Sequence, residues 1–120
     1  MTQVSLVLGG SQAARERAIA AAAKAGVSSV AIVEGLPSGE TALEELPEGV
    51  NLDVFRVAPG CPCCSGNLTI RVTLNRALRK RPAHLYLSLS NAEHREQVLN
   101  FLREPQYRAL LETGDDIVCS

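Results

Sequence analysis

Three cysteines lie within four residues of one another near the middle of this 120-residue chain: Cys61, Cys63 and Cys64. Thiolates are preferred ligands of Zn²⁺ and other soft metal ions, and zinc takes four ligands in tetrahedral geometry. A single turn can supply two or three of them. We therefore predict a metal site at these cysteines, with zinc as the first candidate metal and Cys119 as a candidate fourth ligand.

The same turn also allows other chemistry. Cys61 and Cys64 have C-x-x-C spacing before a predicted helix, whose N-terminus would lower a thiol pKa, so a redox role is an alternative. A thioredoxin-like fold would also need an antiparallel hairpin with a cis-proline, which the pattern does not show. His84 and His94 are further candidates for the fourth ligand, but we expect His84 to be a satisfied polar residue at a strand start and His94 to be solvated. The simplest alternative is a tight turn with no remaining chemistry.

The elements around the turn must position it. An apolar run over residues 52–57 predicts a strand directly before it, and Asn67 is a candidate N-cap for a helix directly after it. The buried face of that helix follows i, i+4, i+7 and i+8 spacing, at Ile70, Leu74, Ala77 and Leu78.

The rest of the chain alternates in the same way. Apolar runs predict further strands over residues 4–8, 29–33, 84–89 and 116–119. Ser11 is a predicted N-cap for a helix to about Lys24, and Ser90 with Glu93 forms a capping-box signature for a helix carrying Val98, Leu99 and Leu102. A last helix is predicted from Pro105 through Leu111, with Gly114 after it.

Alternating strands and helices predict parallel pairing. We expect an α/β fold in three layers, with a mostly parallel sheet of four or five strands and helices on both faces. A chain of this length forms one domain, over residues 1–120. Ligands of such sheets bind at the carboxyl ends of the strands, where the cysteine turn and the turn at Gly9 and Gly10 both fall.

The cysteine segment has the pattern G-C-x-C-C and stands after the third predicted strand, with Leu68, Arg71 and Leu74 following it. In this it resembles the CobW-like P-loop GTPases, which belong with the UreG and HypB metallochaperones. The likeness covers about residues 4–102. It implies a P-loop NTPase-like fold, a GTP-driven cycle, and zinc or another transition metal at the cysteines. We expect the C-terminal domain of that family to be absent.

The phosphate loop departs from the family pattern G-x-x-x-x-G-K-[ST]. With Gly9 at the first glycine, the second glycine, the lysine and the hydroxyl positions hold Ala14, Arg15 and Glu16. Glu16 would bring a carboxylate against the phosphates, and Ala14 adds a Cβ where close approach is needed. No N-K-x-D guanine-reading motif occurs. We interpret a vestigial phosphate loop and expect neither nucleotide binding nor GTP hydrolysis from its members, Gly9, Gly10, Ser11, Arg15 and Glu16.

The predicted function is therefore a non-catalytic, CobW-like domain that binds or hands on a metal ion. The alternatives are a protein-interaction or homodimerisation module with a vestigial site, and a thiol redox protein that uses Cys61 and Cys64. Each alternative belongs to a different functional class, and the sequence leaves all three open.

The residue composition of the chain limits the classes of partner that we expect. The chain has 46% hydrophobic and 21% charged residues, a net charge of −1, two tyrosines, two phenylalanines and no tryptophan. We expect no nucleic acid partner, because neither a basic surface nor base-stacking aromatics are supplied. No apolar run reaches the length of a membrane span, and the N-terminus lacks the features of a signal peptide. We expect a cytoplasmic protein without a membrane partner.

Overall fold

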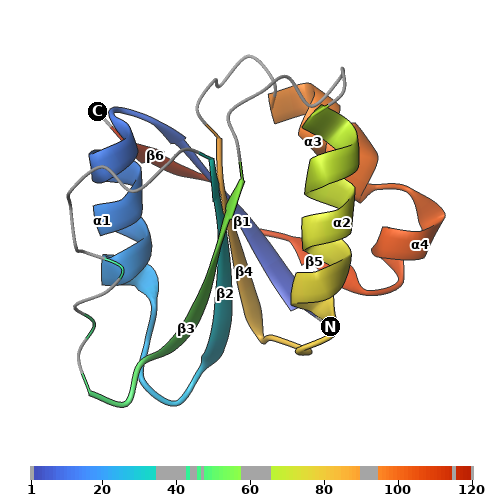
Figure 1. Ribbon diagram of the computed structural model, residues 1–120. Helices are drawn as coiled ribbons and strands as arrows, with labels where there is room; N and C mark the ends of the chain where they lie inside the picture. Colours follow the sequence, from blue (N-terminus) through green and yellow to red (C-terminus); the bar gives the residue numbers. More distant parts are fainter. Residues whose placement is uncertain are drawn as a thin grey trace.

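The computed structural model describes residues 2–34, 43, 46, 48–57, 66–89, 95–114 and 116–119. Helices and strands alternate through most of the chain (Figure 1). In chain order the elements are β1 (Thr2–Gly9), α1 (Gln12–Ala22), β2 (Ser28–Glu34), β3 (Asn51–Val57), α2 (Gly66–Leu78), β4 (His84–Ser88), α3 (Arg95–Leu102), α4 (Pro105–Arg108), β5 (Leu111–Thr113) and β6 (Ile117–Cys119).

The strands form one sheet in the order β3-β2-β4-β1-β5, with β6 also paired to β1. Every strand pairing in the described residues is parallel. This confirms the predicted α/β fold with a parallel sheet. The sheet has six strands, one more than the upper limit of the prediction, because residues 111–113 form a short strand beside the start of β1.

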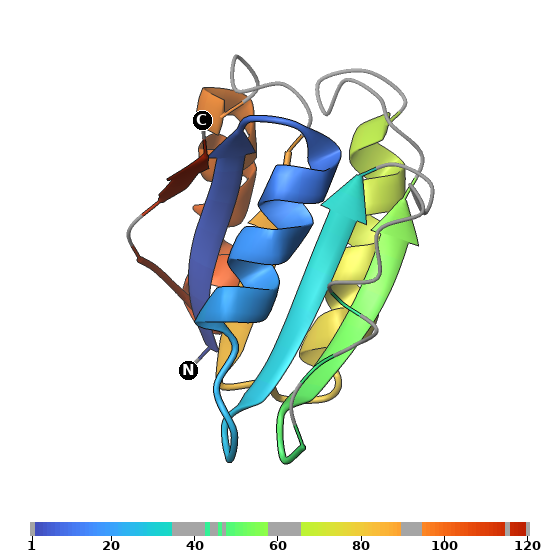
Figure 2. The same ribbon diagram turned by 90° about the vertical axis from the view of Figure 1, so that its left-hand side faces the viewer.

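Helices cover both faces of the sheet. Helix α1 lies on one face, and α2, α3 and α4 lie on the other (Figure 1); the turned view shows α1 in front of the strands (Figure 2). Each face has its own hydrophobic cluster. The larger one lies under α2 and α3 and includes Leu74, Val98 and Leu99, and the smaller one includes Ile19 of α1.

Strand β1 shows why both faces are buried. Val4, Leu6 and Leu8 join the larger cluster, whereas Val7, between them, joins the smaller one. Successive side chains of a strand point to opposite faces, so a central strand of a three-layer fold is apolar almost without interruption. The apolar run over residues 4–8 was therefore a reliable strand signal.

Helix α1 begins where the sequence predicted. The Ser11 side chain accepts a hydrogen bond from the Ala14 backbone N–H at 3.1 Å, which makes Ser11 the N-cap. Ile19 is fully buried, and the surrounding alanines let the helix lie close to the sheet. The helix ends at Ala22, two residues before the predicted end.

Two helix predictions were wrong. Asn67 lies inside α2, which begins at Gly66, so Asn67 is not its N-cap. Helix α4 ends at Arg108 and does not continue through Leu111. The buried Leu111 instead begins β5, and pairing with β1 outweighs the helical spacing of the leucines. The predicted capping box at Ser90 and Glu93 lies outside the described residues.

The last two strands are one interrupted edge. Strand β5 pairs with residues 2–4 of β1, and β6 pairs with residues 7–9 on the same side. Gly114 between them donates its N–H to the Val4 carbonyl at 2.7 Å. A Cβ at Gly114 would lie 3.3 Å from that oxygen, which favours glycine in this close approach.

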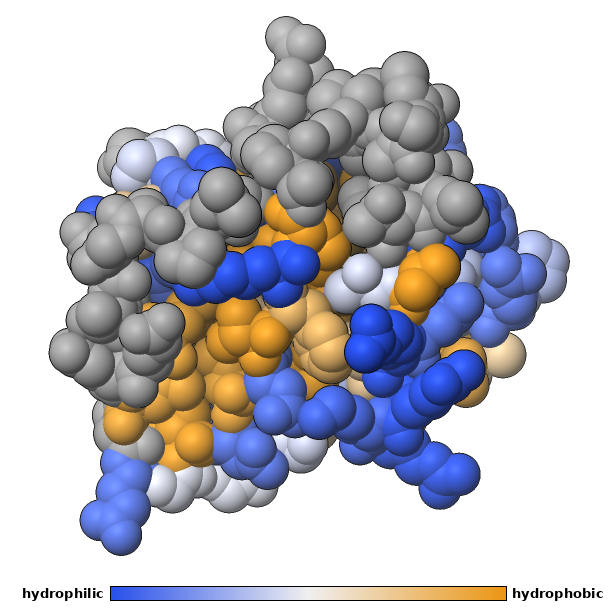
Figure 3. All heavy atoms as spheres, in the orientation of Figure 1, coloured by the Kyte–Doolittle hydropathy of each residue, from blue (hydrophilic) through white to orange (hydrophobic). Residues whose placement is uncertain are grey.

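Polar and apolar surfaces occupy different parts of the view in Figure 3. Apolar side chains show over the left-hand part, where β2 and β3 lie in Figure 1, and hydrophilic ones gather at the lower right, below α2. Of the helices in the described part of the chain, none has both the length and the apolarity needed to cross a bilayer.

Candidate functional site

The three cysteines predicted as metal ligands, Cys61, Cys63 and Cys64, lie outside the described residues. The structure does describe the elements on either side of them. Strand β3 ends at Val57, and helix α2 begins at Gly66, so the connection starts at the carboxyl end of the sheet, as predicted. Within the described ranges no group of three His, Cys, Asp or Glu side chains is arranged to hold a metal ion. The metal-site prediction therefore stays a prediction.

The residues predicted to form a vestigial phosphate loop, by contrast, are all described. Gly9 ends β1 and Gly10 follows, with φ angles of +79° and +60°. Such left-handed backbone conformations are accessible to glycine at low cost. Gly9 also lies beside β6: a Cβ at this position would be 2.5 Å from the Cys119 carbonyl oxygen. Both the turn and the adjacent strand therefore require glycine here.

The guanidinium of Arg15 fills the inside of this turn. Its Nη1 donates to the carbonyl oxygens of Gly9, at 3.1 Å, and Gly10, at 2.9 Å, and its Nε donates to Ser88 Oγ at 3.1 Å. The residue is only 5% exposed. A phosphate loop presents backbone N–H groups to an anion, but here two carbonyl oxygens hold a cation. The turn is therefore bound to the protein's own positive charge.

Glu16 is locked in a second buried interaction. Both of its carboxylate oxygens accept hydrogen bonds from Arg56 at 3.1 Å, and Gln12 donates to one of them at 2.8 Å. Glu16 is 1% exposed. Burial by itself would raise the pKa of Glu16, but the hydrogen bonds from Arg56 and Gln12 and the nearby charges of Arg56 and Arg15 outweigh it and hold the pKa below its usual value.

These contacts determine what the carboxyl edge of the sheet can do. The Arg15 and Glu16 side chains, which stand at the lysine and hydroxyl positions of the phosphate-loop pattern, make hydrogen bonds inside the protein. A nucleotide phosphate would have to displace the guanidinium from two carbonyls and would meet the carboxylate of Glu16. Breaking the hydrogen bonds of a buried charged group and bringing a second anion beside a buried carboxylate both cost free energy, so these contacts disfavour a phosphate in this turn.

Cys119 is the one predicted cysteine ligand in the described residues. Its thiol lies 3.8 Å from the Ala14 carbonyl oxygen and packs against the smaller cluster. It ends β6, so it lies at the predicted edge of the sheet. However, four strand spacings separate β6 from β3, about 19 Å in all.

His84 lies at the start of β4, away from the carboxyl edge. Its Nε2 is 3.2 Å from Ser5 Oγ, and its ring stacks on Tyr86 with centroids 4.6 Å apart. Burial and the nearby charge of Lys24 lower the pKa of His84. The prediction of a satisfied polar residue at a strand start is confirmed. The prediction for His94 lies outside the described residues.

Sequence reasoning missed two members of the polar cluster at this edge. Arg56 and Ser88 were each assigned only to a predicted strand. An arginine between Phe55 and Val57 in a predicted strand was a signal, since a charged residue among apolar neighbours needs a partner where it is buried. The partner, Glu16, lies 40 residues earlier and could not be paired with it without the fold.

Comparisons with protein-family models, curated proteins and solved structures yield no match for this chain. The parallel α/β fold and the geometry of the Gly9–Glu16 turn rest on the structure alone. The resemblance to the CobW-like GTPases stays a prediction from the cysteine segment and the order of elements.

Proposed function

We propose that this protein is a non-catalytic, CobW-like α/β domain that binds or hands on zinc or another transition metal through Cys61, Cys63 and Cys64. Three thiolates in one turn are a donor set suited to Zn²⁺ or Co²⁺. The turn follows a strand at the carboxyl end of a parallel sheet, where ligands of such folds bind. We place the protein in the reducing cytoplasm, where clustered cysteines more often bind metal or do redox work than form structural disulfides.

One observation carries the non-catalytic part of the proposal. The Arg15 guanidinium occupies the turn that a GTPase would use for phosphate, and Glu16 is paired with Arg56 beside it. We thus propose that the cysteines bind metal here without the nucleotide cycle of a CobW-like GTPase. Three ligands from one turn leave a coordination position for a fourth group, which suits transfer of the metal.

The experiment is a Co²⁺ titration of the reduced, full-length protein, followed by thiolate-to-cobalt absorbance in the near ultraviolet. We expect a saturable band with one equivalent of metal, and strong loss of the band in Cys63→Ser. The matched control is Cys119→Ser, which removes one thiol outside the turn. Loss of the band in this control as well would make Cys119 the fourth ligand. The absence of a band in the reduced wild type would overturn the proposal.

The second candidate, a homodimerisation module, is favoured by the edge of the sheet. In the described residues β6 pairs only with β1, so its other side is an open edge. Val118 on this strand is 75% exposed. An open, apolar edge strand can pair with another strand. Light scattering should then show a dimer that Val118→Lys converts to a monomer; a wild-type monomer at all concentrations tested would contradict this candidate.

A further inference from the structure

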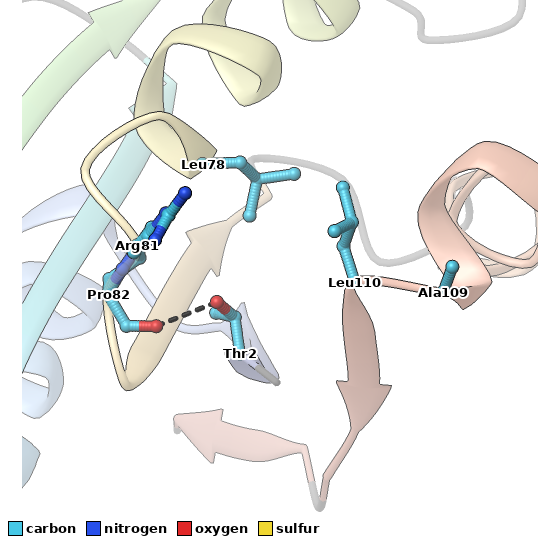
Figure 4. Close-up of a pocket in the computed structure, with 6 residues that line it drawn as sticks. All are labelled: Thr2, Leu78, Arg81, Pro82, Ala109 and Leu110. Carbon is cyan, nitrogen blue, oxygen red and sulfur yellow. Dashed lines mark hydrogen bonds between the residues drawn. The ribbon is translucent and has the colours of Figure 1, made fainter.

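A cavity of about 500 Å³ lies at the amino end of the sheet, at the opposite end from the Gly9–Glu16 turn (Figure 4). It is formed where the start of β1, the end of α2 and the link between α4 and β5 meet. Its size lies within the range of about 300–1,000 Å³ that is typical of small-molecule sites. Six of the described residues line it: Thr2, Leu78, Arg81, Pro82, Ala109 and Leu110.

The floor of the cavity is held in place, and its walls are apolar. The Thr2 hydroxyl donates to the Pro82 carbonyl at 2.7 Å, and both residues are buried. Leu78 and Leu110 line the space above them (Figure 4). Leu110 is 50% exposed, so part of its apolar surface is open to solvent. The cavity therefore offers apolar surface to a ligand on a fixed polar base.

Arg81 brings a positive charge to this apolar cavity. It follows α2 in the turn closed by hydrogen bonds from Lys80 N–H to the Ala77 carbonyl and from Arg81 N–H to the Leu78 carbonyl. Its φ angle is +49°, and it is the one non-glycine residue with a positive φ in the described part of the chain. Glycine is the usual residue in this position after a helix. The chain thus holds an arginine where glycine would be less strained.

The guanidinium of Arg81 makes no ion pair with any carboxylate of the described residues. Arg56, Arg71 and Arg95 each do, with Glu16, Glu104 and Asp116 respectively. A strained backbone position and a charge with no ion-pair partner among the described residues both point away from a role for Arg81 in stabilising the fold. The charge stands where a ligand in the cavity would meet it.

We propose that this cavity binds a small amphiphilic carboxylate, whose apolar body packs between Leu78 and Leu110 and whose carboxylate pairs with Arg81. A guanidinium can bind a carboxylate through two parallel hydrogen bonds, which gives both affinity and orientation. The site lies at the other end of the sheet from the end of β3 and the start of α2, the two elements between which the cysteines stand in the chain. The negative charge of the carboxylate distinguishes the proposed ligand from a neutral amphiphile.

Octanoate and octanol are suitable probes, with binding to the full-length protein followed by amide chemical shifts. We expect saturable binding of octanoate, and at least about tenfold weaker binding of octanol, because a charge-assisted hydrogen bond is lost. Arg81→Gly should weaken octanoate binding by a similar factor. It should also raise the Tm by about 3 °C, since glycine adopts the observed φ without strain. A binding loss in a more stable protein cannot be attributed to unfolding.

The matched control is Arg79→Ala, which removes an exposed cation from the same turn without changing a lining residue. It should leave octanoate binding within about twofold of wild type. Leu110→Ser, at a half-exposed position, should weaken both probes. The proposal is overturned by a wild type that shows no saturable octanoate binding, by unchanged affinity in Arg81→Gly, or by equal losses in Arg79→Ala and Arg81→Gly. Co²⁺ titration of Arg81→Gly should match wild type, so the two proposals fail separately.

Discussion

An arginine lies beside a turn at each end of the sheet, and the two arginines have opposite surroundings. At the carboxyl end, Arg15 is buried and donates three hydrogen bonds to Gly9, Gly10 and Ser88. At the amino end, Arg81 is exposed beside a cavity, has no carboxylate partner among the described residues, and sits in a strained backbone conformation. The first arginine stabilises a turn, whereas the second leaves its charge available.

The difference shows that a turn at a sheet edge is not a binding site by position alone. The carboxyl edge has the position that ligands of parallel sheets use, but the part of it around Arg15 and Glu16 is satisfied by internal charges. The amino edge is not the usual place for ligands of parallel sheets. It nevertheless has the cavity, and Arg81 beside it has no ion-pair partner among the described residues. Four predictions test this contrast, and they start with the largest expected effect.

The first prediction compares two glycines with similar backbone angles, Gly9 at the carboxyl edge and Gly26 at the amino edge. Their φ angles are +79° and +80°, but only at Gly9 does an added Cβ meet a neighbour, the Cys119 carbonyl oxygen at 2.5 Å. Gly26→Ala should cost about 1–2 kcal/mol from the left-handed conformation alone. Gly9→Ala should cost about 3 kcal/mol or more, because β6 must also move.

Urea unfolding of the two variants measures this difference. Nearly equal losses would mean that β6 yields to the added Cβ without cost, which would contradict a tightly packed carboxyl edge.

The second prediction concerns the buried carboxylate. Glu16→Ala removes the carboxylate that Arg56 binds and should lower the free energy of unfolding by about 3 kcal/mol. Arg56 is partly exposed and can turn to solvent, which keeps the loss at the low end for a buried pair. The double variant Glu16→Ala/Arg56→Met should recover part of the loss. Strictly additive losses in the double-mutant cycle would show that the pair is not coupled.

The third prediction compares the two arginines directly. Arg15→Ala removes the donor to two carbonyls and a hydroxyl and should cost about 2 kcal/mol. Arg81→Ala should change stability by less than about 0.5 kcal/mol, because Arg81 makes no ion pair with the described residues. Thermal unfolding of both variants provides the measurement, and a larger loss for Arg81→Ala would reverse the contrast between the two ends.

The fourth and smallest effect is a pH dependence at the start of β4. Burial and the charge of Lys24 hold the pKa of His84 below its ordinary value of 6.5 in the folded protein. The unfolded chain therefore binds a proton first as the pH falls. The contribution of neutral His84 to stability is present above about pH 6.5 and is lost as the pH falls toward its lowered pKa.

Unfolding at about pH 7.5 and about pH 5.5 measures this loss. His84→Gln should make the loss smaller, whereas His94→Gln, at the other histidine of the chain, serves as the control. An unchanged pH dependence in His84→Gln would mean that another group causes it.

Local patterns predicted the elements that form the middle of the sheet. The apolar runs near residues 4–8, 29–33, 52–57 and 84–89 are all strands, because a strand buried on both faces needs little besides apolar, β-favouring residues. Ser11 was predicted as an N-cap because capping depends on contacts three residues apart. The helix prediction after Pro105 was wrong. Leu110 and Leu111 fit a helix face and a strand equally well, and only the pairing with the edge of β1 favoured a strand.

The sequence by itself determined the α/β class, the alternation of elements and the departures of Ala14, Arg15 and Glu16 from a phosphate loop, because these depend on residue types at short spacing. It also set three cysteines within four residues of one another. Only the tertiary structure decided that Arg15 binds the carbonyls of its own turn, that Glu16 pairs with Arg56, and that Arg81 lines a cavity. These outcomes depend on groups that are distant in the chain and meet only after the sheet has formed.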